Sequence, residues 1–429
     1  MASFRIPYST EFLHVEIPER NLAGVLESRV NRFTSGVSEE ESVRQALVDP
    51  IGSPRLEELV RGKKSAVIVT SDHTRPVPSR ITMPILLEGM RAANPSIDIR
   101  ILVATGYHRP MTEQELLDKF GPQVVEKENI LMHESRDESA LVHLGELPSG
   151  GELWLNRSAV ETDLLVAEGF IEPHFFAGFS GGRKAILPGI AGYRTVLANH
   201  CAKFISSPFA RTGVLENNPI HIDMLAAAER VNLAFILNVV INMEKKVIRA
   251  FAGHGVKAHA AGCEFLRGLA QVSRSEADVV VTSNGGYPLD QNVYQAVKGM
   301  TSAEATCAEG GVIIIASACN DGHGGQSFFD NLARASGPRE ILDRTANVPM
   351  EETVPDQWEF QILARILDRF RVIVVTDRCE PDMIRAMHLE HASTLQAALD
   401  RAFQLKGKDA KVTVIPDGVA VIVKQGGRR

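Results

Sequence analysis

Eight short apolar runs, separated by segments of helical periodicity, constrain the fold of this chain more than any other feature. Each run is rich in Val, Ile and Leu with little polar alternation, as expected for strands covered on both faces of a parallel sheet. The predicted strands span residues 65–70, 99–105, 163–169, 235–242, 277–284, 311–317, 371–377 and 411–417. Helical patterns such as 81–93 and 112–121 lie between them, and Thr112 with Glu115 predicts a capping box at the start of the second. We therefore expect an α/β fold with mostly parallel sheets.

The chain has 429 residues, which is enough for two or three domains, and it turns polar near residues 268–277 before a new strand begins. We expect residues 1–270 to form an N-terminal α/β domain and residues 275–400 to form a second one. The tail, about residues 405–429, is expected to pack back on the first domain.

Composition excludes several classes of protein. A net charge of −7 and an isoelectric point near 6.0 argue against nucleic-acid binding, which needs a basic face. Five cysteines form no CxxC pair, so we expect reduced thiols, and we interpret Cys201 as a small buried apolar residue in preference to a metal or redox group. No run approaches the roughly 20 apolar residues of a membrane span, and no signal-like segment is seen, so we expect a cytoplasmic protein.

Polar motifs follow three of the predicted strands, at residues 72–76, 106–110 and 170–174. Ligands of open α/β sheets bind at the carboxyl ends of strands, so the three motifs are expected to converge on one cleft. In the first motif, Arg75 offers a planar fork that fits a carboxylate or phosphate, although the motif also suits a surface turn with a helix cap. In the second, His108 suits acid–base work or an ordinary loop position.

The stretch from Glu168 to His200 combines imidazoles, an amine and a glycine-dense loop. FSGGRK resembles a phosphate-cradling nest without being a Walker A sequence, and Lys184 at its end is either a nucleophilic amine in apolar surroundings or a surface lysine. His174 follows a strand end, and His200 ends a helical pattern as a metal ligand or a core histidine.

A fourth motif, GGYPLDQNVYQAVKGM, follows the predicted strand at 277–284. Tyr294, Gln295 and Lys298 lie close to one face of a helix that starts near Asp290, as a site or as a plain amphipathic helix. Trp358 is a core anchor or a cleft wall. The glycine-rich loop at 318–327 matches no nucleotide fingerprint and is expected to be a mobile surface loop.

Four segments together, DHTRP, ATGYHRP, EPHFFAGFSGGRKAILPGI and YPLDQNVYQAVKGM, resemble the nickel-pincer lactate racemase family. The resemblance covers about residues 70–300, and Trp358 extends it. It implies an active site in the cleft between the two domains, with the first domain binding the cofactor and the second closing over the substrate. The implied cofactor is a nickel-pincer nucleotide, a pyridinium mononucleotide that holds nickel through a ring carbon and two sulfurs and that other proteins must synthesise.

The resemblance also implies a role for each matching residue. His200 would be the nickel ligand and Lys184 the amine that can tether the cofactor covalently through a thioamide. His108 and His174 would be the two acid/base residues. The loop that holds the nucleotide would comprise Asp72, His73, Thr74 and Arg75, and the substrate would contact Arg75, Tyr294, Gln295, Lys298 and Trp358.

The implied reaction is the racemisation or epimerisation of a 2-hydroxy acid. Removing the C2 hydrogen as a proton would build charge beside the carboxylate, whereas a hydride can be stored on the cofactor and returned to the other face of a 2-keto acid. Lactate and related aliphatic or aryl acids are favoured by Phe175 and Phe176 beside His174, with malate and sugar acids as alternatives. Other classes are a dehydrogenase, which the missing GxGxxG disfavours, a non-catalytic cofactor carrier, and a zinc hydrolase, which would lack HExxH-like spacing.

Overall fold

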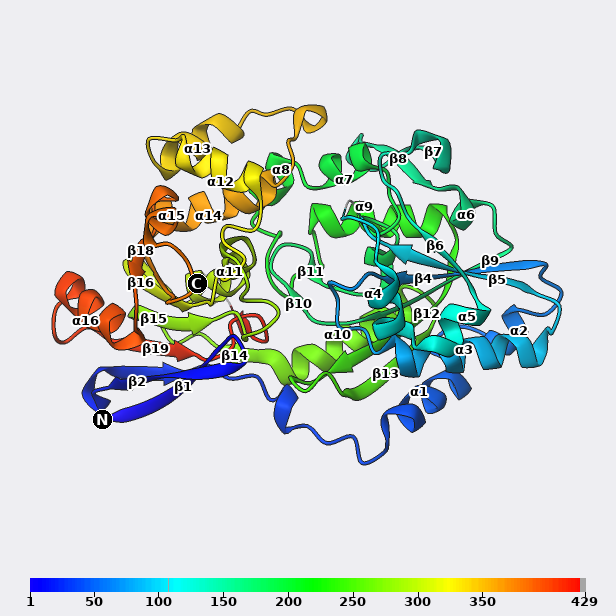
Figure 1. The fold of residues 1–429 in the computed structure, drawn as a ribbon, viewed down its shortest axis with the longest axis horizontal. Coiled ribbons are helices and arrows are strands. Elements are labelled where there is room, and N and C mark those ends of the chain that lie inside the picture. Colours follow the sequence, from blue (N-terminus) through cyan, green and yellow to red (C-terminus); the bar gives the residue numbers. More distant parts are fainter. Residues whose placement is uncertain (107, 425–429) are drawn as a thin grey trace.

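The computed structural model describes residues 1–106 and 108–424, so Tyr107 and the last residues of the predicted tail, 425–429, lie outside it. Two six-stranded sheets, one in each half of the molecule, are flanked by helices (Figure 1). All eight predicted strands are present, and the α/β architecture with mostly parallel sheets is confirmed. No helix of the described residues is long and apolar enough to cross a membrane.

The first sheet has the order β13-β12-β9-β4-β5-β6, and only β13 runs antiparallel to its neighbour. Its strands are β4 (Ser65–Ser71), β5 (Asp98–Ala104), β6 (Asn129–Met132), β9 (Leu164–Phe170), β12 (Leu233–Ile241) and β13 (Val247–Gly253). The chain moves from β4 to β5 on one side and later returns to β9 on the other. The strand order therefore reverses beside β4, which is where α/β sheets open a crevice for ligands.

Both faces of the first sheet are buried, as the unbroken apolar runs predict. Along β4, Ala66 and Ile68 belong to one apolar cluster, and Val67 and Val69 belong to another. The first domain contains the helices α1 (Glu39–Val48), α2 (Leu56–Leu59), α3 (Ser79–Ala93), α4 (Glu113–Phe120), α5 (Pro122–Lys127), α6 (Arg157–Val160), α7 (Tyr193–Asn199), α8 (Ala202–Ile205), α9 (Pro219–Arg230) and α10 (Lys257–Ala270). The predicted capping box of α4 is confirmed, since Thr112 Oγ1 accepts from Glu115 N–H and Glu115 Oε2 accepts from Thr112 N–H.

The second sheet is parallel throughout, with the order β18-β17-β16-β15-β19-β3. Its strands are β3 (Leu22–Val25), β15 (Ala277–Ser283), β16 (Cys307–Ala316), β17 (Arg371–Val375), β18 (Glu390–Ala392) and β19 (Val412–Ile415). Its helices are α11 (Val293–Glu304), α12 (Gln326–Ala333), α13 (Pro338–Thr345), α14 (Gln357–Arg369), α15 (Pro381–Ala386) and α16 (Leu395–Lys406). The strand order reverses again, this time beside β15.

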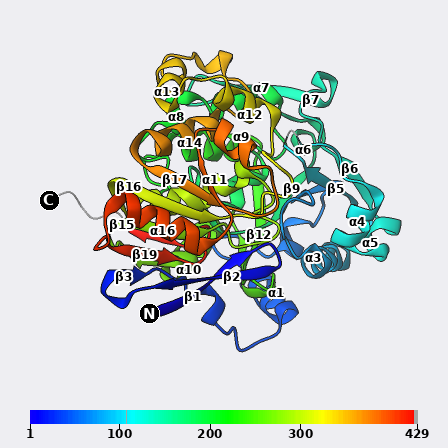
Figure 2. The same cartoon turned by 60° about the vertical axis from the view of Figure 1, so that its left-hand side comes forward.

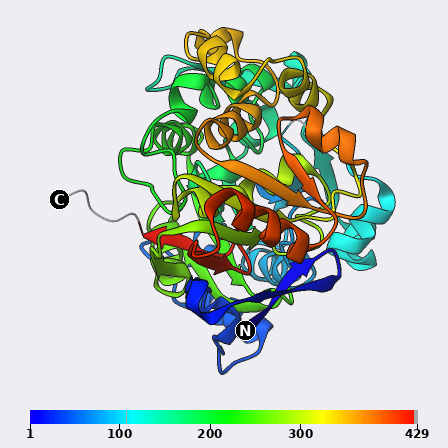
Figure 3. The ribbon, with the colours of Figure 1, turned by 90° about the vertical axis from the view of Figure 1, so that its left-hand side faces the viewer.

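The sheet topology differs from the expected partition at both ends of the chain. β3 and β19 complete the second sheet, and the hairpin of β1 (Ala2–Tyr8) and β2 (Glu11–Ile17) packs its apolar side chains with those of α16. Figures 2 and 3 show this hairpin beside α16, and Figure 1 shows it on the side of the molecule away from the first sheet. The tail contributes β19 to the second domain, while β20 (Ile422–Lys424) pairs with β14 (Gln271–Ser273) at the junction. These pairings join residues far apart in sequence, which local patterns cannot reveal.

The cysteines of the described residues are all free thiols, in agreement with the reduced state expected from the sequence. Cys201 is buried in the apolar cluster under α7 and α8. Its pKa is raised by burial, so this thiol is a packing group and not a thiolate.

Candidate active site

A cavity of about 440 Å³ lies at the carboxyl ends of β4, β5 and β9 and is closed on the other side by α11 and α14. The three motifs after these strands meet there, as expected from the sheet. The sequence-predicted residues that line it are Asp72, Thr74, Arg75, His108, His174, Lys184, His200, Tyr294, Gln295, Lys298 and Trp358. Of the predicted site residues, His73 alone is not among the lining residues.

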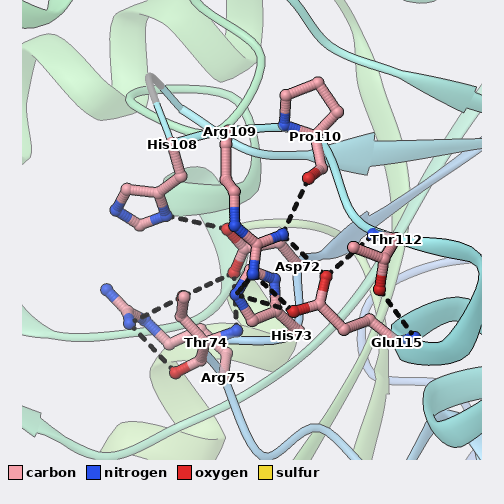
Figure 4. Close-up of polar contacts among 9 residues, drawn as sticks. All are labelled: Asp72, His73, Thr74, Arg75, His108, Arg109, Pro110, Thr112 and Glu115. Atoms are coloured by element: carbon pink, nitrogen blue, oxygen red, sulfur yellow. Dashed lines mark hydrogen bonds and ion pairs between the residues drawn. The ribbon is translucent and has the colours of Figure 1, made fainter.

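The turn after β4 is organised by the buried carboxylate of Asp72. Its Oδ1 accepts from the Thr74 N–H at 3.0 Å and from the Thr74 hydroxyl, and its Oδ2 lies 2.7 Å from His108 Nδ1 (Figure 4). Burial alone would raise the pKa of this carboxyl, but the hydrogen bond and charge of His108 lower it to about 2. Asp72 is therefore ionised, and it fixes the orientation of the His108 ring.

His73 points to the opposite side of this turn, away from the cavity. Its Nε2 lies 3.5 Å from Glu115 Oε1 and 3.4 Å from Arg109 Nη2, beside the Arg109–Glu115 ion pair (Figure 4). Its side chain therefore supports the turn where the sequence predicted a contact with the nucleotide.

His174 is held in a neutral form by its surroundings. It lies in the short strand β10 (Pro173–His174), and its Nδ1 accepts from the Ala177 N–H at 3.2 Å. Burial, and then the charges of Lys184, Lys298 and Arg75, lower its pKa well below the usual value. Since Nδ1 accepts a hydrogen bond, the proton of the neutral ring is on Nε2.

Two phenylalanines form the apolar wall beside the imidazoles. The His174 ring lies 5.0 Å from Phe175 and 4.5 Å from Phe176, and the Phe176 ring lies 5.2 Å from His200. Both phenylalanines are buried and line the cavity. The expectation that they form a pocket wall is confirmed.

Lys184 lies in a short 3₁₀ helix (Gly182–Ala185) after the glycine pair, with its ammonium nitrogen 5.8 Å from the Phe176 ring centroid. Burial lowers its pKa well below the usual value, and Arg183, Arg75 and Lys298 add to the effect. A lowered pKa increases the fraction of this amine that is uncharged and nucleophilic.

The glycine-dense loop is not the open phosphate nest that its sequence resembles. The amides of Ser180, Gly182 and Lys184 donate to Glu172 O, Asn238 Oδ1 and Gly181 O, so protein acceptors already use them. Gly181 and Gly182 have φ of 77° and 52°, and a Cβ on Gly182 would meet the His259 ring at 2.8 Å. The glycines permit close packing and aim Lys184 at the cavity.

His200 follows α7, and its Nδ1 lies 3.0 Å from the Val196 carbonyl. A carbonyl only accepts, so Nδ1 carries the proton and Nε2 keeps its lone pair. Burial, reinforced by the charge of Lys184, lowers the pKa of His200 to about 3. This neutral imidazole with a defined free lone pair suits a metal better than a proton.

The second domain contributes α11 and the start of α14. The Asn292 side chain caps α11 by accepting from the Gln295 N–H at 3.0 Å, and Lys298 follows one turn after Tyr294. Trp358 Nε1–H donates to the Tyr294 hydroxyl at 2.9 Å, which links the first turns of α14 and α11. Tyr294, Lys298 and Trp358 therefore belong to one supported wall of the cavity.

The glycine-rich loop at 318–327 lies against this wall, in contrast to the expected mobile surface loop. The carbonyls of Gly322 and His323 accept from the N–H groups of Val293 and Tyr294, and Gly324 lines the cavity. Its composition indicated flexibility because glycine permits many conformations, but contacts with the first turn of α11 fix it in place.

Sequence analysis assigned no role to two buried carboxylic acids that line this cavity, Glu168 and Glu359. Glu168 accepts hydrogen bonds from the hydroxyls of Thr70, Ser79 and Thr82 at 2.5–2.6 Å, which ties β9 to β4 and to α3. The sequence did indicate that Glu168 has a specific role, because it is the single acid inside the apolar run of β9 and an isolated charge is rarely buried without hydrogen-bond partners.

Two α/β domains that enclose three imidazoles, an arginine and two lysines form a site suited to acid–base chemistry on a small anionic substrate. Family models described as the lactate racemase N-terminal domain and the lactate racemase C-terminal domain match residues 8–213 and 272–423. The chain belongs to the lactate racemase family and is an isomerase. The dehydrogenase, hydrolase and non-catalytic carrier alternatives are therefore set aside.

Known proteins match the chain over nearly its whole length. A lactate racemase from Thermoanaerobacterium thermosaccharolyticum is 54% identical over 99% of this chain and 100% of that protein, and one from Lactiplantibacillus plantarum is 53% identical with the same coverage. The structure of the lactate racemase apoprotein from T. thermosaccharolyticum matches with a TM-score of 0.96, over 99% of this chain and 100% of that one. A Thermotoga maritima protein shares the fold at 20% identity, with a TM-score of 0.65.

Proposed function

We propose that this isomerase interconverts the two enantiomers of lactate by reversible hydride transfer to a nickel-pincer nucleotide. The observation that carries the proposal is the meeting of His108 and His174 with Arg75 and Lys298 in one cavity. The full-length similarity to proteins named lactate racemase supports lactate as the substrate. The phenylalanine wall suits a methyl group better than a second carboxylate, so malate and sugar acids are less favoured.

The donor groups of the cavity fit the proposed cofactor. His200 would be the protein ligand to the nickel of this cofactor, because its ring is neutral and its Nε2 lone pair is available. Among residues 1–106 and 108–424, no three His, Cys, Asp or Glu side chains are grouped so as to hold a metal ion. A metal bound here would take its other ligands from the cofactor.

Lys184 and the turn after β4 would hold the organic part of the cofactor. The lowered pKa of Lys184 increases the uncharged fraction of the amine, which is the form that could make the thioamide tether. Thr74 and Arg75 line the cavity beside Asp72, so they are the candidates to bind the nucleotide. When bound, the pyridinium–nickel unit supplies a reversible hydride acceptor.

The cations of the cavity would bind the substrate carboxylate. Arg75 and Lys298 enter from different domains, so they can grip the carboxylate from two sides while the planar 2-keto acid reorients between them. Burial lowers the pKa of Lys298, with Arg75 as the second cause, so an incoming carboxylate restores its preference for the charged form.

His108 and His174 would handle the hydroxyl proton of opposite enantiomers. The contact with ionised Asp72 places a proton on His108 Nδ1 and leaves Nε2 as a base, and the same carboxylate stabilises the imidazolium that forms. His174 Nε2 carries a proton while Nδ1 accepts from Ala177. To act as a base at Nε2, His174 must shift its proton and give up this bond, so the two imidazoles start from unequal states.

The proposal is tested by loading the protein with the nickel-pincer nucleotide and supplying either enantiomer of lactate. We expect both to reach a racemic mixture without added nicotinamide cofactor, as measured by chiral chromatography. His200→Ala should lose at least about tenfold in bound nickel by elemental analysis, as expected for a lost ligand contact. Preferential turnover of malate or an aryl 2-hydroxy acid would overturn the choice of substrate, and full nickel content in His200→Ala would overturn the choice of ligand.

A further inference from the structure

Glu359 is a buried acid of the cavity wall for which neither the fold nor the sequence motifs supply a role. It lies in the first turn of α14 beside Trp358, is 1% exposed and lines the same cavity as Lys298. In the part of the chain that the structure describes, its Oε1 has no hydrogen-bond partner. A buried carboxyl oxygen without a donor is costly, so a donor is expected to reach it in the working enzyme.

Lys298 is the cation that the surroundings of Glu359 provide. Two charged groups act on the pKa of Glu359, namely Lys298 from α11 and Asp356 from the start of α14. Asp356 is itself an acid, so it cannot stabilise a second carboxylate. The groups facing Lys298 are Arg75 and Glu172 from the first domain and Glu359 from α14. Burial and Arg75 lower the pKa of Lys298, whereas Glu172 and Glu359 oppose that change.

The link between their helices places the two groups on one wall of the cavity. The Trp358–Tyr294 hydrogen bond joins the first turn of α14 to the first turn of α11, and Glu359 and Lys298 are close neighbours of these two residues in sequence. An ammonium group has three donors, so it can serve a substrate carboxylate and Glu359 together.

We propose that Glu359 is a positioning residue that accepts a hydrogen bond from Lys298 and holds its ammonium group charged and aimed at the substrate carboxylate. This inference rests on the proposed function for the identity of the carboxylate, but its effect on Lys298 does not depend on any substrate. Glu359 is not expected to touch the reacting atoms.

The first experiment measures Lys298 alone in the full chain. Competitive acetylation of the amine, followed by mass spectrometry across pH 6–9, reports the fraction that is uncharged. In Glu359→Gln, which keeps the shape but removes the charge, Lys298 acetylation at pH 7.5 should rise about threefold, because a fall of about one unit from a pKa of about 8 raises the uncharged fraction from about a quarter to about three quarters. Glu359→Asp should restore most of the original behaviour, and Glu352→Gln, an exposed acid in a 3₁₀ helix, should match the unsubstituted protein.

The second experiment measures binding of racemic lactate to the cofactor-loaded protein by calorimetry, since a racemic mixture undergoes no net conversion. Affinity of Glu359→Gln should be within about threefold of the unsubstituted protein at pH 6 and should fall about tenfold further by pH 8.5. Parallel pH curves in both experiments, with melting temperatures unchanged, would overturn the inference. A shift in acetylation without any lactate binding by the unsubstituted protein would support Glu359 and refute lactate as the substrate.

Discussion

At the scale of single residues, the two imidazoles of the cavity differ in which nitrogen carries the proton. His108 Nδ1 faces the Asp72 carboxylate and carries the proton, so the lone pair of His108 is on Nε2. His174 Nδ1 accepts from the Ala177 N–H, so the proton of His174 is on Nε2. A racemase must accept a proton from substrates of either hand. In the proposed mechanism one ring begins as a base and the other as a donor, and each turnover would exchange these states.

Removing either imidazole should therefore stop racemisation in both directions, because every crossing uses both rings. We expect His108→Ala and His174→Ala each to lower kcat by about 100-fold or more, with unchanged melting temperatures. His14→Ala, which removes an exposed imidazole from β2, is the matched control. Undiminished turnover by either active-site variant would remove that residue from the catalytic role.

The Asp72–His108 contact also predicts a pH-dependent contribution to stability. The pKa of Asp72 in the folded protein, about 2, lies below its ordinary value of 3.8, so the stabilisation is complete above about pH 4 and lost as the pH falls towards 2. Asp72→Asn should lower the free energy of unfolding by about 2 kcal/mol at pH 7, with the difference shrinking between pH 4 and 2. Urea unfolding at a series of pH values measures this, and a difference that does not change with pH would contradict it.

At the scale of elements, the interior strands were predictable and the edge strands were not. Each of the eight predicted strands has two partners in its sheet, whereas the four edge strands β3, β6, β13 and β18 were not predicted. Buried interior strands are marked by continuous apolar residues. An edge strand such as β3, with the sequence LAGV, becomes a strand only through its distant partner β19.

The 3₁₀ helix that carries Lys184 depends on a glycine with positive φ. Gly182→Ala should destabilise the protein by about 1–3 kcal/mol, because the φ of 52° disfavours alanine and its Cβ would meet the His259 ring at 2.8 Å. It should also reduce covalent attachment of the cofactor, as measured by intact-mass spectrometry. Gly268→Ala in α10, where no atom lies within 4 Å of the new Cβ, should be neutral or stabilising. Equal stability of the two variants would contradict this role for the loop.

At the scale of the whole molecule, both domains contribute to one cavity. The first sheet contributes the carboxyl ends of β4, β5 and β9, and the second domain contributes α11 and α14. The convergence of residues 72–76, 106–110 and 170–174 was predictable because parallel strands end at a common edge. The closing contribution of Tyr294, Lys298 and Trp358 required the resemblance to a known family, since nothing local in their sequence places one domain over another. The outward position of His73 and the burial of Glu359 depend on side-chain packing, which neither route could supply.

The central claim, that the C2 hydrogen leaves and returns as a hydride, is tested most directly by racemising unlabelled enantiopure lactate in D₂O with the cofactor-loaded enzyme. A hydride stored on a cofactor does not exchange with solvent, so the product enantiomer should carry no deuterium at C2 by NMR. Deuterium at C2 in each molecule of the product enantiomer would show that the hydrogen leaves as a proton, and it would contradict this account.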